Sequence, residues 1–107
     1  MDSRQLVTAL KALADPTRLK IVSLLRHRSC CICELVPIFE ISQPAVSKHM
    51  SRLKQAGLVV ESRKGQWVFY ALNDERLRQV QEALGNLPDY SGEFEKLAQQ
   101  GLLVTCE

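Results

Sequence analysis

The chain has 107 residues, 46% of them apolar and 24% charged, with a formal net charge of +2. A chain of this length is expected to form one domain over residues 1–107, whose core is stable without a disulfide framework. The sequence has no apolar run of the roughly 18 residues that a membrane span requires and no secretory signal, so we expect a cytoplasmic protein without membrane contact.

Charge is distributed unevenly along the chain. Residues 1–72 hold 11 Lys and Arg against 5 Asp and Glu, whereas residues 73–107 hold 3 against 7. A basic body favours a polyanionic partner, although a solvated basic surface without a partner gives the same count.

Apolar residues at helical spacing predict two amphipathic helices at the start of the chain. The first covers residues 6–14. Asp15 and Pro16 then supply an N-cap and a first-turn proline for a second helix that runs to Leu25. A short third helix is expected over 32–39, after a group of cysteines.

A fourth helix is enclosed by Ser42, a good N-cap, and Gly57, a helix stop. Val46, Met50 and Leu53 fall on one face of this helix, and the other face is polar and basic. A helix with such a face fits the DNA major groove, where Gln, Arg, Lys and Ser side chains read bases or phosphates. The alternative without a function in binding is an amphipathic helix whose polar face is only solvated.

After the fourth helix the pattern changes to that of a β-hairpin. Residues 58–61 and 67–72 are rich in β-branched and aromatic side chains, and the polar segment 62–66 between them is expected to form the turn. Arg63 and Lys64 make the hairpin tip basic, so the tip is expected to lie along DNA phosphates.

A further helix is expected to begin at Asn73 or Asp74 and to end near Asn86, with a last helix over 91–100. The order of elements predicts a mainly α protein with a β-hairpin wing, which is the winged helix-turn-helix fold. Winged helices also serve as protein-interaction modules, and that function stays an alternative. An enzyme is not expected, because no catalytic set of residues can be assembled.

Four cysteines complete the pattern, and three of them are clustered: Cys30, Cys31, Cys33 and, near the end of the chain, Cys106. Neighbouring cysteines are poorly placed for ordinary disulfide geometry with one another. In a reducing compartment, clustered thiols more often bind metals or sense oxidants.

Several segments together resemble one family, the bacterial metalloregulatory repressors of the ArsR/SmtB type. They are Ala12 to Leu19, Ser42 to Met50 with Leu53, Ala56 to Leu58, and Arg63 to Trp67 with Tyr70. The resemblance implies a homodimeric repressor that leaves its double-stranded operator DNA when an inducer binds, with the first helix and the helix after the wing at the dimer interface. It also implies DNA contacts from Gln43, Ser47, Lys48 and Arg52.

The segment Cys31-Ile32-Cys33-Glu34-Leu35 is similar to the cysteine motif of the arsenical-sensing members, although Val36 stands where a further cysteine often follows. The resemblance implies As(III) or Sb(III) as inducer, held best by three thiolates. Cadmium or lead, or an oxidant acting on the same thiols, stays an alternative.

The third thiolate has two candidates. Cys30 lies three residues before Cys33 and would share its helical face, whereas Cys31 and Cys33 would point opposite ways on a helix. We therefore expect an ion bound to all three to unwind the first turn of the third helix. Cys106 is the secondary candidate.

Overall fold

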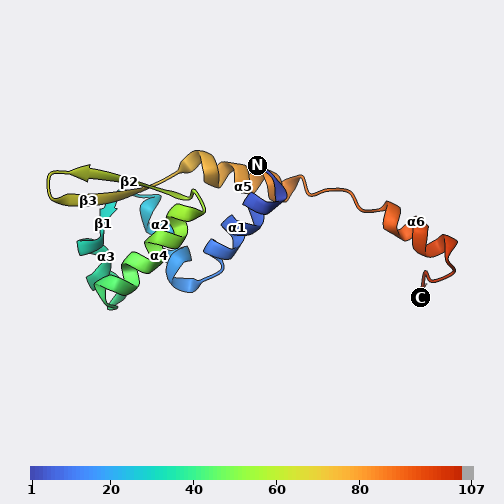
Figure 1. Ribbon diagram of the computed structural model, residues 1–107, viewed down its shortest axis with the longest axis horizontal. Helices are drawn as coiled ribbons and strands as arrows, with labels where there is room; N and C mark the ends of the chain where they lie inside the picture. Colours follow the sequence, from blue (N-terminus) through green and yellow to red (C-terminus); the bar gives the residue numbers. More distant parts are fainter. Residues whose placement is uncertain (105–107) are drawn as a thin grey trace.

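The computed structural model describes residues 1–104, and Figure 1 shows a helical body from which a C-terminal arm projects. The elements are α1 (Ser3–Leu13), α2 (Pro16–Leu25), β1 (Cys30–Cys31), α3 (Ile32–Phe39), α4 (Gln43–Gln55), β2 (Val59–Lys64), β3 (Trp67–Leu72), α5 (Asp74–Gly85) and α6 (Gly92–Gln99). The winged helix-turn-helix expected from the sequence is confirmed.

The predicted N-caps are present. Asp15 accepts a hydrogen bond from the Arg18 amide at 3.0 Å, and Ser42 accepts one from the Ala45 amide at 3.2 Å. Asn73 caps α5, and its side-chain amide also donates to the Gly57 carbonyl at 2.9 Å. That bond joins the end of the α4 segment to the start of α5.

The three strands form one antiparallel sheet in the order β1-β3-β2. The hairpin differs from the expected one, because β2 extends to Lys64 and leaves only Gly65 and Gln66 between the strands. Gly65 has a φ of 63°, which a glycine adopts without steric cost. Arg63 and Lys64 therefore belong to a strand rather than to the turn.

Strand β1 was not expected from the sequence. It pairs with the wing strand β3, with Cys30 opposite Tyr70 and Cys31 opposite Phe69. The cysteine cluster is thus hydrogen-bonded to the wing at one end and continues into α3 at the other.

The core lies among α1, α2, α3, α4 and the sheet. Its largest fully buried side chains are Ile21, Val46, Leu35, Met50, Leu53 and Leu58. Within the described range, no helix is both long enough and apolar enough to cross a membrane.

Candidate functional site

Helix α4 presents the polar face that the sequence predicts. Val46, Met50 and Leu53 are fully buried against the core. The residues expected to contact DNA are exposed or half-buried on the rest of the helix: Gln43, Ser47, Lys48 and Arg52. The helix can therefore enter a groove without disturbing the core.

The wing carries its two cations at the far end of β2. Arg63 lies opposite Val68 and Lys64 opposite Trp67, and both cations are exposed. Successive residues of a strand point to opposite faces, so these two side chains lie on either side of the wing. The Lys64 ammonium stands 5.9 Å from the centre of the Phe69 ring, a cation–π contact.

A polar contact that the sequence did not reveal ties α4 to the wing. Lys54 donates to the Glu61 carboxylate at 3.1 Å, and the Tyr70 hydroxyl donates to the same oxygen at 3.3 Å. The hydrogen bond from Lys54 lowers the pKa of Glu61, while burial and the Glu61 charge raise the pKa of Tyr70. Lys54 thus links α4 to the wing through Glu61.

A second network fixes α4 to the junction of α1 and α2. The Arg18 guanidinium donates to the Ala12 carbonyl at 2.6 Å and to Nδ1 of His49 at 3.2 Å. The Asp15 carboxylate lies 3.9 Å from the same His49 nitrogen. The pKa of Asp15 is lowered, chiefly by the hydrogen bond that its carboxylate accepts from the Arg18 amide. His49, for which the sequence suggested no specific role, is a half-buried anchor of α4.

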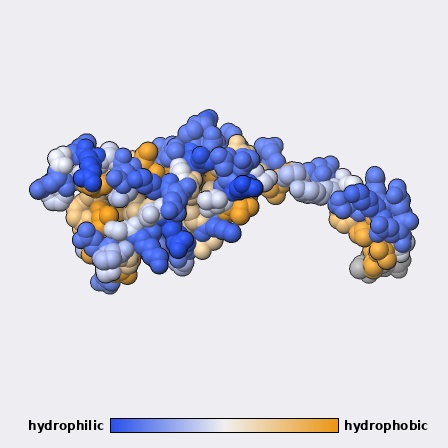
Figure 2. Space-filling model, in the orientation of Figure 1, coloured by the Kyte–Doolittle hydropathy of each residue, from blue (hydrophilic) through white to orange (hydrophobic). Residues whose placement is uncertain are grey.

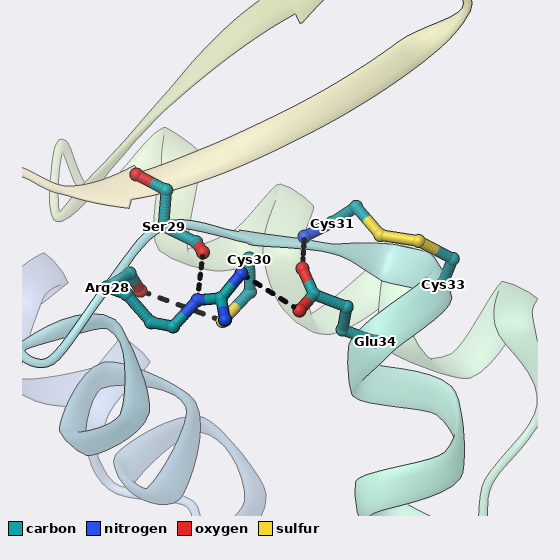
Figure 3. Close-up of polar contacts among 6 residues, drawn as sticks. All are labelled: Arg28, Ser29, Cys30, Cys31, Cys33 and Glu34. Atoms are coloured by element: carbon teal, nitrogen blue, oxygen red, sulfur yellow. Dashed lines mark hydrogen bonds and ion pairs between the residues drawn. A yellow bond between two sulfur atoms is a disulfide. The ribbon is translucent and has the colours of Figure 1, made fainter.

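The expectation that neighbouring cysteines are poorly placed for a disulfide is wrong for Cys31 and Cys33, which form one (Figure 3). Cys31 is the N-cap of α3, with extended backbone at φ −90° and ψ 163°, rather than a residue of the helix. Its side chain therefore turns toward Cys33, and the two Cα atoms are 5.2 Å apart, a usual separation for a disulfide. Bringing these two sulfurs together does not require the first turn of α3 to unwind.

Cys30 lies apart from that pair. Its side chain is buried in the core, and its thiol donates to the Arg28 carbonyl at 3.6 Å (Figure 3). Burial raises the pKa of the Cys30 thiol and the Glu34 charge adds to this, while Arg28 opposes it. Across residues 1–104, no three His, Cys, Asp or Glu side chains gather in a group that could hold a metal ion. Cys106 lies outside the described residues.

Glu34 holds the start of α3 in place. One of its carboxylate oxygens accepts from the Cys31 amide at 3.0 Å, and the other pairs with the Arg28 guanidinium at 3.2 Å (Figure 3). Sequence reasoning did not assign this role, although a Glu three residues after an N-cap is the spacing of a capping box.

If the first helix and the helix after the wing form a dimer interface, the apolar spacing of the sequence predicts contacts from Leu77, Val80, Leu84 and Leu87 with Leu6 and Leu10. This stripe is only partly exposed. Val80 is 3% exposed and belongs to the core of its own protomer, which corrects its assignment to an interface, and Leu77 packs against the same core. Leu84 near the end of α5 and Leu87 just beyond it are exposed, and so is Val7 on α1, which was not among the residues expected at the interface.

Residues 15–61 match the family model described as bacterial regulatory protein, arsR family. The chain is 40% identical over 85 residues to the arsenic resistance transcriptional regulator ArsR1 of Pseudomonas putida, a match covering 78% of this chain and 66% of that protein. It is 39% identical over 84 residues to the arsenical resistance operon repressor of Staphylococcus xylosus, covering 78% of this chain and 81% of that repressor. A crystal structure of an ArsR family transcriptional regulator superposes with a TM-score of 0.73 at 27% identity, covering 80% of this chain and 89% of that one.

A recognition helix with a basic wing at its side defines a winged helix-turn-helix DNA-binding protein. The chain belongs to the ArsR family of transcriptional regulators, and its DNA partner is an operator. This confirms the resemblance seen in the sequence and agrees with the expectation of a regulator rather than an enzyme.

Proposed function

We propose that this protein is a homodimeric repressor that leaves its operator when As(III) or Sb(III) binds Cys31 and Cys33. Cys30 is the proposed third thiolate, with Cys106 as the alternative. The proposed DNA contacts are Gln43, Ser47, Lys48 and Arg52 of α4 and Arg63 and Lys64 of the wing. Two relatives that the chain resembles are named for arsenic or arsenical resistance, which supports this choice of inducer.

The observation that carries the proposal is the position of Cys31 between the two DNA-binding elements. This residue pairs with Phe69 of the wing strand β3 and is also the N-cap of α3, which packs beside the recognition helix. A displacement of Cys31 therefore shifts both the wing strand β3 and the helix-turn-helix. An inducer shifts the equilibrium only if it binds the two arrangements with different affinities.

The first turn of α3 is well suited to respond. Pro37 lies inside the helix and has no amide hydrogen, so the carbonyl of Cys33 lacks the usual helical partner four residues on. At the start of α3, the Cys31 amide is held instead by the Glu34 carboxylate. Moving Cys31 to hold an ion would break its hydrogen bond with the Glu34 carboxylate and the two-residue pairing of β1 with β3. It would not require a long helix to unwind.

The thiol chemistry of the proposed step is balanced without an oxidant. In the reduced protein, each As–S bond replaces one As–OH bond of arsenite, and the thiol proton leaves with that hydroxide as water. Binding therefore changes neither the oxidation state of arsenic nor the proton balance. A divalent cadmium or lead ion would instead displace protons from the thiols, so its affinity would rise with pH.

The test follows release of a fluorescent operator by anisotropy, in a phosphine reductant that does not compete as a thiol. Cys33→Ser should bind DNA like the parent but no longer be released by arsenite. Val36→Cys, which adds a thiol at the position where arsenical sensors often have one, should be released at lower arsenite. Arsenite release of Cys33→Ser at the parent concentration would refute the proposal. Parallel titrations with antimonite and with cadmium at two pH values identify the ion class.

The Cys31–Cys33 disulfide favours a second candidate function, in which an oxidant is the signal. A hydroperoxide would accept two electrons and two protons from the thiols, giving the disulfide, an alcohol and water. Release of DNA by peroxide, reversed by reductant and absent in Cys33→Ser, would support this function. Release by arsenite alone would reject it.

A further inference from the structure

The C-terminal arm comprises residues 86–104. Its first residues, Asn86 to Pro88, line a cleft beside α1, and the rest of the arm lies away from the body of the chain. Every residue from Leu84 to Val104 is exposed. The radius of gyration is 19.5 Å, against about 13 Å for a compact domain of this length. In Figure 1 the arm leaves α5 beside the N-terminus and extends α6 into open space.

The composition of the arm is not that of a solvated tail. Half of the exposed large apolar residues of the described chain lie within it: Leu87, Tyr90, Phe94, Leu97, Leu102, Leu103 and Val104. Figure 2 shows apolar side chains gathered on the lower side of the arm, with hydrophilic residues above them. An isolated helix of eight residues is also marginal in water, so α6 requires a surface on which to fold.

The direction of the arm points to a second copy of the chain as that surface. The arm begins at the end of the molecule where α1 and α5 present Val7 and Leu84 to solvent. This is also the face that the proposed homodimer uses, so the space into which α6 extends is the space next to a second protomer.

The same face offers a receptor with two clefts. A cleft of about 510 Å³ lies between the start of α1 and the end of α5. Its lining is part apolar, with Met1, Leu6 and Ala83, and part polar, with Asp2 and Glu82. A neighbouring cleft of about 250 Å³ is lined by Arg4 and Arg76, neither of which forms an ion pair within residues 1–104.

The arm complements this receptor in charge. Over residues 86–104 it carries Asp89, Glu93 and Glu95 against Lys96 alone, whereas residues 1–85 carry 13 Lys and Arg against 8 Asp and Glu. The acidic first turn of α6, with Glu93 and Glu95, thus suits the smaller cleft that Arg4 and Arg76 line, and the apolar residues of the arm suit the apolar part of the larger cleft.

We infer that the arms are exchanged: α6 of each protomer packs on the α1–α5 face of its partner. The inference rests on the proposed homodimer but on neither its inducer nor its DNA contacts. Exchange explains why the apolar residues of the arm are left exposed in one protomer, and it places each arm across the dimer interface.

The first experiment identifies the surface that the arm contacts. A photo-crosslinking amino acid replaces Phe94 in the full chain, and equal amounts of natural-abundance and ¹⁵N-labelled protein are mixed, exchanged and irradiated. Crosslinks joining a labelled to an unlabelled peptide, at the α1–α5 face, are the expected result. Crosslinks only between equally labelled peptides, with the arm folded on its own body, overturn the inference, and so does the absence of crosslinks in a protein shown to be dimeric.

The second experiment measures the contribution of the arm to association. Phe94→Asp should weaken the dimer about tenfold or more in sedimentation equilibrium, because it puts a charge into an apolar contact. Gln99→Asp is the matched control, since it adds the same charge to the same helix outside the apolar stripe, and it should leave the dimer unchanged. Equal effects of the two variants overturn the inference. A parent protein that is monomeric rejects the homodimer and the exchange together, whereas operator binding and arsenite release are tested independently of both.

Discussion

The guanidinium of Arg18 in α2 donates a hydrogen bond of 3.2 Å to Nδ1 of His49 in the recognition helix α4. Arginine can only donate, so Nδ1 of His49 is the acceptor in this contact. The same guanidinium donates to the Ala12 carbonyl at the end of α1. One side chain thus connects three helices and sets where α4 lies on the body.

Arg18→Ala should destabilise the fold and weaken operator binding, although Arg18 is not a proposed DNA contact. Removing the donor leaves two half-buried acceptors unsatisfied, which costs about 1–3 kcal/mol. Urea unfolding of Arg18→Ala, His49→Ala and the double variant gives the coupling, expected to be about 0.5–3 kcal/mol. Additive effects would show that the contact does not anchor α4. Arg26→Ala, which removes the exposed cation at the C-cap of α2, is the control.

The wing cations should act on DNA of any sequence. Replacing Arg63 and Lys64 together by Ala should weaken operator and unrelated DNA alike and reduce the slope of log affinity against log salt by about 1.8. The control removes two exposed cations outside α4 and the wing, Arg26 and Arg78, and should leave the slope unchanged. If the wing variant keeps the parent slope, these residues do not contact phosphates.

The Lys54–Glu61 contact predicts an acid-sensitive orientation of the wing. The folded-state pKa of Glu61 is lowered below its usual value of 4.5, so the stabilisation is complete above that value and is lost as the pH falls through the lowered pKa. The thermal midpoint of Glu61→Gln should therefore fall below that of the parent at neutral pH and converge with it in acid. Glu82→Gln, on the exposed side of α5, serves as the control. A pH-independent difference would contradict the ionic contact.

The elements that sequence reasoning predicted well depend on local signals. Asp15 and Ser42 were recognised as caps because an N-cap acts on amides two or three residues away. The buried side of α4 followed from helical spacing alone. The change to a β pattern after Gly57 predicted the wing, and the polar and basic face of α4 predicted a DNA partner. The family resemblance then added the inducer and the individual DNA contacts.

The parts that sequence reasoning missed depend on distant partners. Strand β1 has only two residues, and it exists because β3, some 40 residues later, offers Tyr70 and Phe69 as partners. Placing Cys31 in that strand instead of in a helix is what allows it to reach Cys33. Val80 has an apolar side chain that suits an interface or a core equally, and only packing against the body decides between them.

Two substitutions of Glu34 distinguish the effects of its two contacts. Glu34→Gln can still accept from the Cys31 amide but loses the ion pair with Arg28, whereas Glu34→Ala loses both. We expect the Gln variant to be induced like the parent, and the Ala variant to be released from DNA at lower arsenite because Cys31 is no longer held. Anisotropy titrations of the two variants make the comparison, and equal responses would show that this carboxylate does not hold Cys31 against the inducer.

The identity of the third thiolate is decided by Cys30→Ser. Serine keeps a donor for the Arg28 carbonyl and is nearly isosteric, so the fold and DNA binding should be retained. For Cys30 to reach the ion it must leave its position opposite Tyr70, so arsenite should speed amide hydrogen exchange across β1 and β3 in the parent. In Cys30→Ser both that acceleration and release from DNA should be lost. If Cys30→Ser responds normally and Cys106→Ser does not, the third thiolate is Cys106. A variant lacking Cys30, Cys31 and Cys33 that is still released at the arsenite concentration of the parent would refute the site as a whole.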